Sequence, residues 1–148
     1  MNQRDLRTIL LVEDSAADAE MAIDALREAK LANPIVHVED GVECMDFLHS
    51  RGRFADRPPE APAVVLLDIK MPRMDGLEAL TQMRADNAFK RIPVVILSSS
   101  REESDLARSW DLGVNAYVLK PVDVQQFFTA VQTLGHFWGV LNQRPEGE

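Results

Sequence analysis

Five short apolar runs recur along the chain, and each is followed by a segment whose apolar residues recur at helical spacing. The runs are residues 8–13 (TILLVE), 34–38 (PIVHV), 64–68 (VVLLD), 93–98 (PVVILS) and 116–120 (AYVLK). Strands that alternate with helices in this way form parallel sheets, because each parallel connection needs a crossover segment. The alternation therefore predicts an α/β fold, a doubly wound parallel sheet of five strands flanked by five helices.

Capping residues indicate where the helices begin and end. Three polar residues stand three positions before an acid, as in a capping box: Ser15 before Asp18, Asp75 before Glu78 and Ser100 before Glu103. Gly113 suits the left-handed position that follows a helix. The last helix is expected to run from Asp123 to about Leu141, and the polar, proline-bearing segment 51–62 is expected to be a longer surface loop.

Length, charge and cysteine use narrow the class of protein. The chain has 148 residues, of which 46% are hydrophobic, so we expect a single domain over residues 1–148, with a core at about 7–141 and a flexible tail at 142–148. A net charge of −8 argues against broad binding to nucleic acid or anionic membranes. The sequence shows neither a secretory signal nor a stretch of about 20 apolar residues, so a cytoplasmic protein is expected. Cys44, which has apolar neighbours, is interpreted as a core residue.

Polar residues stand where the predicted strands end. Glu13 and Asp14 follow the first strand, Asp68 ends the third, Ser98 the fourth and Lys120 the fifth. The carboxyl ends of parallel strands share one edge of the sheet, and the ligands of such folds bind there. Taken singly, each of these residues suits a surface loop, but their placement at one edge favours a common site.

The residue types at this edge suit the chemistry of a phosphoryl group. The carboxylates of Glu13, Asp14 and Asp68 repel one another unless a cation is present, and a hard divalent ion such as Mg²⁺ prefers oxygen ligands. The Ser98 hydroxyl and the Lys120 ammonium stabilise negative oxygens. Asp68 is placed as the nucleophile, which would give an aspartyl phosphate. Three histidines lack metal-ligand spacing and are interpreted as ordinary structural residues: His37, His49 and His136.

From about residue 7 to residue 138 the sequence resembles the receiver domain of two-component response regulators, of the single-domain type found in chemotaxis. The motifs that carry the resemblance are the acidic pair at 13 and 14, LLDIKMPRMDG at 66–76, the serine pair at 98 and 99, and YVLKP at 117–121. The resemblance implies the flavodoxin-like strand order 2-1-3-4-5. It also implies a cis peptide bond between Lys120 and Pro121.

The resemblance further implies roles for single residues. Asp68 would be the phosphoacceptor and, with Asp14, would bind Mg²⁺. The backbone carbonyl of Lys70 would complete the metal site, and Glu13, which stands where many members have Asp, would act through metal-bound water. Three residues would respond to the phosphoryl group: Ser98 as the switch hydroxyl, Tyr117 as the switch aromatic and Lys120 as the phosphate-binding lysine.

Two segments are similar, more narrowly, to the small regulators that partner bacterial phytochrome kinases: HSRGRFADRPPEAP at 49–62 and FFTAVQTLGHFWGVL at 127–141. This likeness implies a phytochrome-type histidine kinase as partner and a homodimer through the fourth helix, fifth strand and fifth helix. The last helix carries more apolar residues than one buried face uses, and Phe128, Phe137 and Trp138 are the predicted interface residues. The alternative is that these aromatic residues fold back over the domain's own edge.

The predicted function is that of a stand-alone receiver in a phosphorelay. It would take a phosphoryl group from a histidine kinase onto Asp68 with Mg²⁺, hydrolyse it later, and otherwise not act as an enzyme. Phosphate on Asp68 would draw in Ser98 and let Tyr117 turn inward, and the output would pass through protein contacts. Three alternatives stay open: a phosphorylation-independent binding module, a flavin-binding protein of this fold, and a haloacid-dehalogenase-type phosphatase, which would need a second acid where Lys70 stands.

Overall fold

Each of the five apolar runs forms a strand, and a helix follows each strand. The structure is a computed structural model that describes residues 7–132. Within these residues the strands are β1 (Ile9–Val12), β2 (Ile35–Val38), β3 (Val64–Leu67), β4 (Val94–Ser98) and β5 (Ala116–Leu119). The helices are α1 (Ala16–Glu28), α2 (Gly41–Leu48), α3 (Gly76–Ala85), α4 (Glu103–Asp111) and α5 (Val124–Gln132), with a 3₁₀ turn, η1 (Gly52–Phe54), after α2. The predicted fold class is confirmed.

The strands of the described chain pair in parallel in the order β2-β1-β3-β4-β5, as the resemblance implied. Ile9 of β1 lies between two partners, Ile35 of β2 on one side and Val64 of β3 on the other. The chain therefore moves outward from β1 to β2 and then crosses back to β3. Sheets of this kind open their ligand crevice where the strand order reverses, which here is the carboxyl end of β1 and β3.

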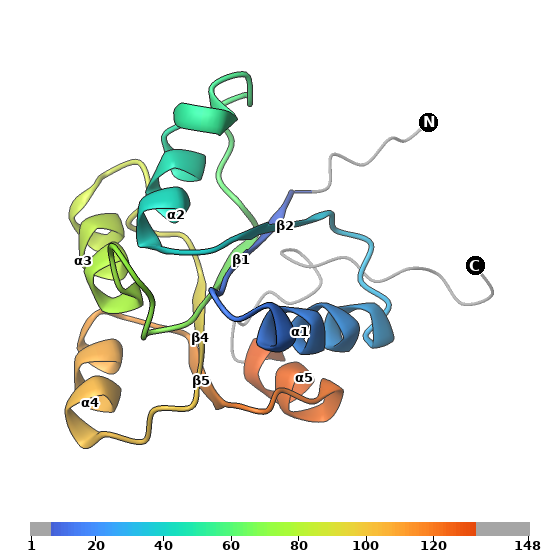
Figure 1. The fold of residues 1–148 in the computed structure, drawn as a ribbon. Coiled ribbons are helices and arrows are strands. Elements are labelled where there is room, and N and C mark those ends of the chain that lie inside the picture. The colour runs from blue at the N-terminus through green and yellow to red at the C-terminus, as the bar shows by residue number, and fades with distance from the viewer. Residues whose placement is uncertain (1–6, 133–148) are drawn as a thin grey trace.

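Helices cover both faces of the sheet (Figure 1). α1 and α5 lie on one face, and α2, α3 and α4 lie on the other. Successive residues of β1 serve the two faces in turn, because side chains alternate along a strand: Leu11 packs in a cluster with Phe127 of α5, and Leu10 packs with Phe47 of α2 and Leu80 of α3. β1, β3 and β4 are buried along their whole length, which explains their continuous apolar sequences.

Two of the three predicted helix caps form. At α1 the Ser15 hydroxyl accepts a hydrogen bond from the Asp18 N–H at 3.2 Å, and at α3 the Asp75 carboxylate accepts one from the Glu78 N–H at 2.9 Å. At α1 the return bond of the capping box differs from the prediction, because the Ser15 N–H donates to the Glu13 carboxylate at 3.1 Å. The Asp18 carboxylate reaches a different residue, described below.

The predicted cap at Ser100 is wrong. α4 begins after Glu102, whose side chain makes no capping hydrogen bond. The Ser100 hydroxyl donates to the Asp105 carboxylate at 2.8 Å and accepts from the Glu102 N–H at 3.4 Å. A carboxylate is a stronger acceptor than a backbone group, so Ser100 bonds into the first turn of α4 from outside it. The end of α4 follows the prediction, since Gly113 has a φ of +75°, a conformation that glycine adopts without strain.

The segment 51–62 is a surface loop that is held against the end of α2. The Arg57 guanidinium carbon lies 3.7 Å from the centroid of the Phe47 ring. Arg57 donates to the Phe47 carbonyl at 3.0 Å and to the Ser50 hydroxyl at 3.3 Å, and it also donates to the Glu60 carbonyl. The Phe47 carbonyl thus accepts from Arg57 in addition to the Ser50 N–H at 3.2 Å, and the bonds of Arg57 give the loop a defined path.

α5 begins as predicted, since the Asp123 carboxylate accepts a hydrogen bond from the Gln126 N–H at 2.8 Å. Five predictions concern parts of the chain outside residues 7–132: the helix end at Leu141, the tail 142–148, His136, Phe137 and Trp138. Among the helices described for residues 7–132, each is too short or too polar to cross a bilayer.

We predict that Cys44 is unreactive in the folded protein. Its side chain is fully buried between α2 and the sheet, and burial raises the pKa of its thiol to about 12, so the thiolate that reacts with a maleimide is nearly absent at neutral pH. Native protein incubated with a maleimide should keep its mass, and protein in concentrated guanidinium chloride should gain one adduct. Rapid labelling of the native protein would contradict the assigned core position.

Candidate functional site

Three carboxylates meet at the carboxyl ends of β1 and β3. Glu13 and Asp14 follow β1 directly, and Asp68 follows β3, whose Leu67 pairs with Val12 of β1. One carboxylate oxygen from each acid lies within 4.8 Å of the other two. Glu13 and Asp68 are buried and Asp14 is exposed. The structure thus brings together the three acids that the sequence placed at this edge, and we name them the acid trio.

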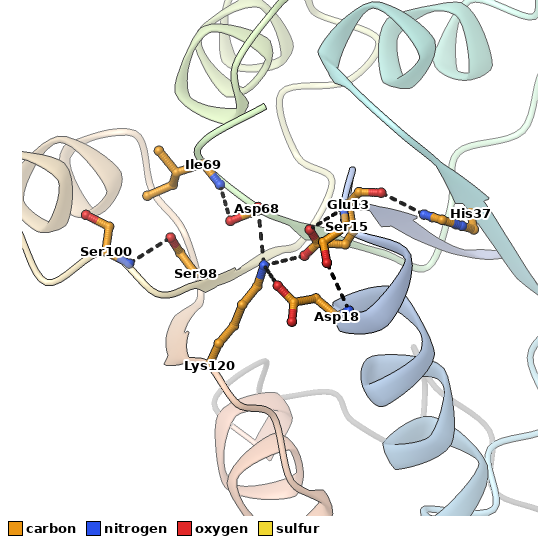
Figure 2. A network of polar contacts seen from close by, with 9 residues as sticks. All are labelled: Glu13, Ser15, Asp18, His37, Asp68, Ile69, Ser98, Ser100 and Lys120. Atoms are coloured by element: carbon orange, nitrogen blue, oxygen red, sulfur yellow. Dashed lines mark hydrogen bonds and ion pairs between the residues drawn. The ribbon is translucent and has the colours of Figure 1, made fainter. Parts of the chain in front are cut away.

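Lys120 reaches into the acid trio from the end of β5 (Figure 2). Its Nζ lies 2.5 Å from Glu13 Oε1 and 3.3 Å from Asp68 Oδ2. A third acid, Asp18 in the first turn of α1, approaches the same Nζ at 2.9 Å. The side chain of Lys120 is only 12% exposed, so its contacts with the buried Glu13 and Asp68 lie largely out of water, whereas the Asp18 side chain is 38% exposed. The Lys120–Pro121 peptide bond that precedes α5 is cis, as the resemblance implied.

The charges at this edge shift one another's proton affinity. Burial raises the pKa of Glu13, and the hydrogen bond from Lys120 offsets only part of that shift. Burial acts to lower the pKa of Lys120, but its hydrogen bonds to Glu13 and Asp18 and the nearby negative charge of Asp68 outweigh burial, so its pKa is raised well above the ordinary value. Lys120 is therefore a permanent cation at physiological pH.

The loop after β3 fixes the orientation of Asp68. Asp68 Oδ1 accepts a hydrogen bond from the Ile69 N–H at 2.8 Å, which leaves Oδ2 facing Lys120. The loop folds back so that the Gly76 N–H donates to the Ile69 carbonyl at 2.8 Å. A Cβ on Gly76 would lie 1.9 Å from the Asp68 carbonyl oxygen, so only glycine lets α3 begin this close to the strand end. Gly76 is therefore a steric requirement of the site.

Ser98 lies at the end of β4, on the Lys120 side of Asp68 (Figure 2). It is buried, and its hydroxyl accepts a hydrogen bond from the Ser100 N–H at 3.1 Å. The Tyr117 hydroxyl, on β5, donates to the Ser100 carbonyl at 2.9 Å, and burial raises the pKa of Tyr117. Ser100 thus connects the predicted switch hydroxyl to the predicted switch aromatic residue.

The side chain of Lys70 leads away from the acid trio. Lys70 Nζ lies 3.5 Å from Asp105 Oδ2 in α4, the same oxygen that accepts the Ser100 hydroxyl. Lys70 is 63% exposed, so this ion pair is weak. Asp105 nevertheless contacts Lys70 in the loop after β3 and Ser100 in the loop after β4, so it links both loops to α4.

Three contacting residues were missed by sequence reasoning. Asp18 was interpreted only as part of a helix cap, Asp105 received no role, and His37 was interpreted as an ordinary structural residue. A ring nitrogen of His37 on β2 lies 2.7 Å from the Glu13 carbonyl oxygen, so β2 does contribute to this edge. The first turn of α1 starts at the same edge as the acid trio. The position of Asp18 in that turn is the sequence feature that could have predicted its contact with the site.

The donor set fits a hard divalent cation. All three groups of the acid trio are carboxylates, the ligand type that such cations prefer, and one of them is exposed and therefore accessible. Burying Glu13 and Asp68 together is unfavourable without positive charge. Lys120 supplies one such charge, and a bound cation would supply two more.

A family model described as the response regulator receiver domain matches residues 9–132. The chain therefore belongs to the response regulator receiver family, in which phosphorylation of an aspartate is typical. This membership decides against the haloacid-dehalogenase and flavin-binding alternatives.

Its relatives include response regulators of phytochromes. Response regulator Rcp1 of Synechocystis sp. is 36% identical over 132 residues, 89% of this chain and 88% of its own length, and its Mn²⁺-bound form has been solved (TM-score 0.74). Bacteriophytochrome response regulator RtBRR shares 49% identity and a TM-score of 0.86 over 96% of this chain and 86% of its own. The phosphorylated cyanobacterial phytochrome response regulator RcpA shares 38% identity and a TM-score of 0.75 over 90% and 94%.

We predict that Lys120→Met destabilises the metal-free protein by about 1–3 kcal/mol at neutral pH, because buried acids lose their charged partner. The raised pKa of Lys120 means that its contribution is fully present below the pKa of an unfolded lysine and is lost as pH rises through the folded value. In the variant Glu13 loses the hydrogen bond that lowers its pKa. Glu13 then takes up a proton more readily, so the deficit should shrink from about pH 7.5 to about pH 5.

Urea denaturation with EDTA at both pH values measures this deficit. Lys90→Met, which removes an exposed lysine in the turn between α3 and β4, is the control and should change stability little at either pH. A deficit that grows toward the lower pH would show that Lys120 does not neutralise the acid trio.

Proposed function

We propose that this chain is a receiver that takes a phosphoryl group from a histidine kinase onto Asp68 in the presence of Mg²⁺. The observation that carries the proposal is the position of Asp68, whose carboxylate lies close to those of Glu13 and Asp14 and has its Oδ2 3.3 Å from Lys120 Nζ. In the transfer, an Asp68 oxygen forms a bond to phosphorus while the phosphorus–nitrogen bond of a phosphohistidine breaks, and the leaving imidazole keeps the electron pair and takes up a proton.

The residues around Asp68 have complementary tasks in this proposal. Asp14 and Asp68 would hold the cation, with the Lys70 carbonyl as a further ligand and Glu13 acting through metal-bound water. Bound there, the cation would neutralise charge on the phosphoryl oxygens. An all-carboxylate set of side-chain donors suits a hard divalent cation, of which Mg²⁺ is the one that we propose, and the Mn²⁺-bound form of Rcp1 supports a divalent ion in a relative. Lys120 and Ser98 would bind the remaining phosphoryl oxygens.

A phytochrome-type histidine kinase is the partner that we propose. Support comes from the relatives, since RtBRR and RcpA are both named as response regulators of phytochromes and RtBRR shares 49% identity with this chain. The chain would then work in the cytoplasm, where the kinase transfers its phosphoryl group. Beyond accepting and hydrolysing its own phosphate, it would not act as an enzyme.

The signal would leave the site through Ser98 and Tyr117. Movement of Ser98 toward a phosphoryl group would break its bond with the Ser100 N–H, and Ser100 is also the residue whose carbonyl holds the Tyr117 hydroxyl. Release of Tyr117 would change the surface between α4 and β5. The output would pass from that surface to a downstream protein.

The proposal predicts that the protein gains one phosphoryl group from acetyl phosphate, and that the gain requires both Asp68 and a divalent cation. Intact mass spectrometry would compare wild type with Asp68→Asn, each with Mg²⁺, with Mn²⁺ and with EDTA. Asp75→Asn, which removes an acid of the same loop that caps α3, is the matched control and should still gain the group. A wild type that never gains the group would favour a phosphorylation-independent binding module.

We further propose a homodimer through α4, β5 and α5. An apolar groove runs along this face, and five of its lining residues are Trp110, Tyr117, Val118, Gln126 and Ala130. Trp110 is 53% exposed, which is unusual for so large an apolar side chain. Phe128, a predicted interface residue, is half-buried and packs partly on the domain's own core. Phe137 and Trp138 are the other proposed contacts.

Trp110→Asp is expected to shift the protein from dimer to monomer, because it places a charge in the proposed contact. Mass in solution, measured by light scattering over a range of concentrations, checks this. Met21→Asp is the matched control, since Met21 is the other exposed large apolar side chain among the described residues, at 43%, and lies on α1. A monomeric wild type, or equal loss of the dimer in both variants, would remove this interface.

A further inference from the structure

We propose that Asp18 is a positioning residue that holds the Lys120 ammonium within reach of Asp68, an inference that rests on the phosphoacceptor function proposed above. Asp18 Oδ2 lies 2.9 Å from Lys120 Nζ, closer than the 3.3 Å to Asp68 Oδ2. The acids of the trio are the proposed ligands of the cation, and Asp18 is not one of them. Its carboxylate is left to act on the lysine.

The three contacts of Lys120 are compatible with one another. An ammonium group carries three N–H donors, and Lys120 has three carboxylate partners within 4 Å, those of Glu13, Asp18 and Asp68. One donor can therefore stay on Asp18 while another turns to an oxygen beside Asp68. Asp18 restrains the lysine at its working position and does not draw it away.

A closed ring of contacts fixes Asp18 itself (Figure 2). Lys120 contacts both Glu13 and Asp18, Glu13 Oε2 accepts the Ser15 N–H at 3.1 Å, and the Ser15 hydroxyl accepts the Asp18 N–H at 3.2 Å. The ring joins the start of α1 to the end of β5. The helix cap holds the backbone of Asp18, and from that fixed start its partly exposed carboxylate reaches Lys120.

Asp18 becomes more important when a cation occupies the acid trio. A divalent cation repels an ammonium group and competes for the oxygens of Glu13 and Asp68. Asp18 lies outside the trio, so it is the partner of Lys120 that such a cation does not compete for directly. A long lysine side chain without that partner would regain rotamer freedom, which it must lose again to bind a phosphoryl group.

The first test measures the rate of phosphorylation by acetyl phosphate with Mg²⁺. Asp18→Asn keeps the shape of the side chain and the backbone cap but removes the charge, and we expect the rate constant to fall about threefold to tenfold. Asp18→Glu should recover part of the loss. Asp24→Asn is the matched control, because it removes the same charge from an exposed position on the same helix, and it should change the rate less than about twofold.

The second test needs neither metal nor phosphate. Acylation of Lys120 by an N-hydroxysuccinimide ester, followed by peptide mass mapping with EDTA present, reports how well the amine is held and protonated. We expect Asp18→Asn to raise the acylation rate of Lys120 at least threefold, and Asp24→Asn to leave it unchanged. Circular dichroism and thermal melting would verify that each variant is folded, so that a general loss of structure is distinguished from release of the lysine.

The outcomes separate this inference from the proposed function. If wild type and Asp18→Asn are phosphorylated at equal rates, or Asp18→Asn is faster, Asp18 does not position the lysine and the inference fails while the phosphoacceptor function stands. If wild type is never phosphorylated, the proposed function fails. The acylation test still decides then whether Asp18 restrains Lys120, and equal acylation in all variants would overturn the contact itself.

Discussion

The charge balance around Lys120 is the interaction on which the site depends. Glu13 and Asp68 are buried close together, and without a nearby cation their repulsion would oppose the sheet edge that brings them together. Lys120 contacts both, and Asp18 adds a third acid on its other side. One lysine offsets only part of the negative charge of these acids. The repulsion between them is reduced, and the net negative charge that remains still attracts a divalent cation. The excess negative charge would repel a phosphoryl group, so the proposed transfer to Asp68 would need a bound cation.

The parallel topology of the sheet brings these opposite charges to one edge. The ends of β1, β3 and β5, which carry Glu13, Asp68 and Lys120, are neighbours in space. The first turn of α1 starts at the same edge, so Asp18 contacts Lys120 although the two are 102 residues apart in sequence. Because every strand points the same way, every strand-end residue reaches the same edge. The positions of the site residues therefore depend on the packing of the strands that carry them, so a mutation in the core below this edge would change the geometry of the site indirectly.

The site is joined to the surface by short polar connections. Ser100 bonds to Ser98 through its N–H, to Tyr117 through its carbonyl and to Asp105 through its hydroxyl. Asp105 also meets Lys70 from the loop that carries Asp68. A change at Asp68, the proposed phosphoacceptor, would reach α4 by both loops, and the face formed by α4 and β5 also carries the exposed Trp110.

The sequence by itself predicted the five strands, their order through the family resemblance, and the placement of Glu13, Asp14, Asp68, Ser98 and Lys120 at one edge, because the apolar runs mark the strands and the carboxyl ends of parallel strands share an edge. It determined the caps at Ser15 and Asp75, where the acceptor is local. The Ser100 bond to Asp105 is also local, but there the carboxylate is a stronger acceptor than the backbone, and no cap forms. Only the tertiary structure decided that His37 contacts the Glu13 carbonyl and that Asp18 reaches Lys120. In the sequence, an acid that only caps a helix cannot be distinguished from one, such as Asp18, that also contacts the site. The difference depends on which residue, distant in sequence, the fold places within reach of its carboxylate.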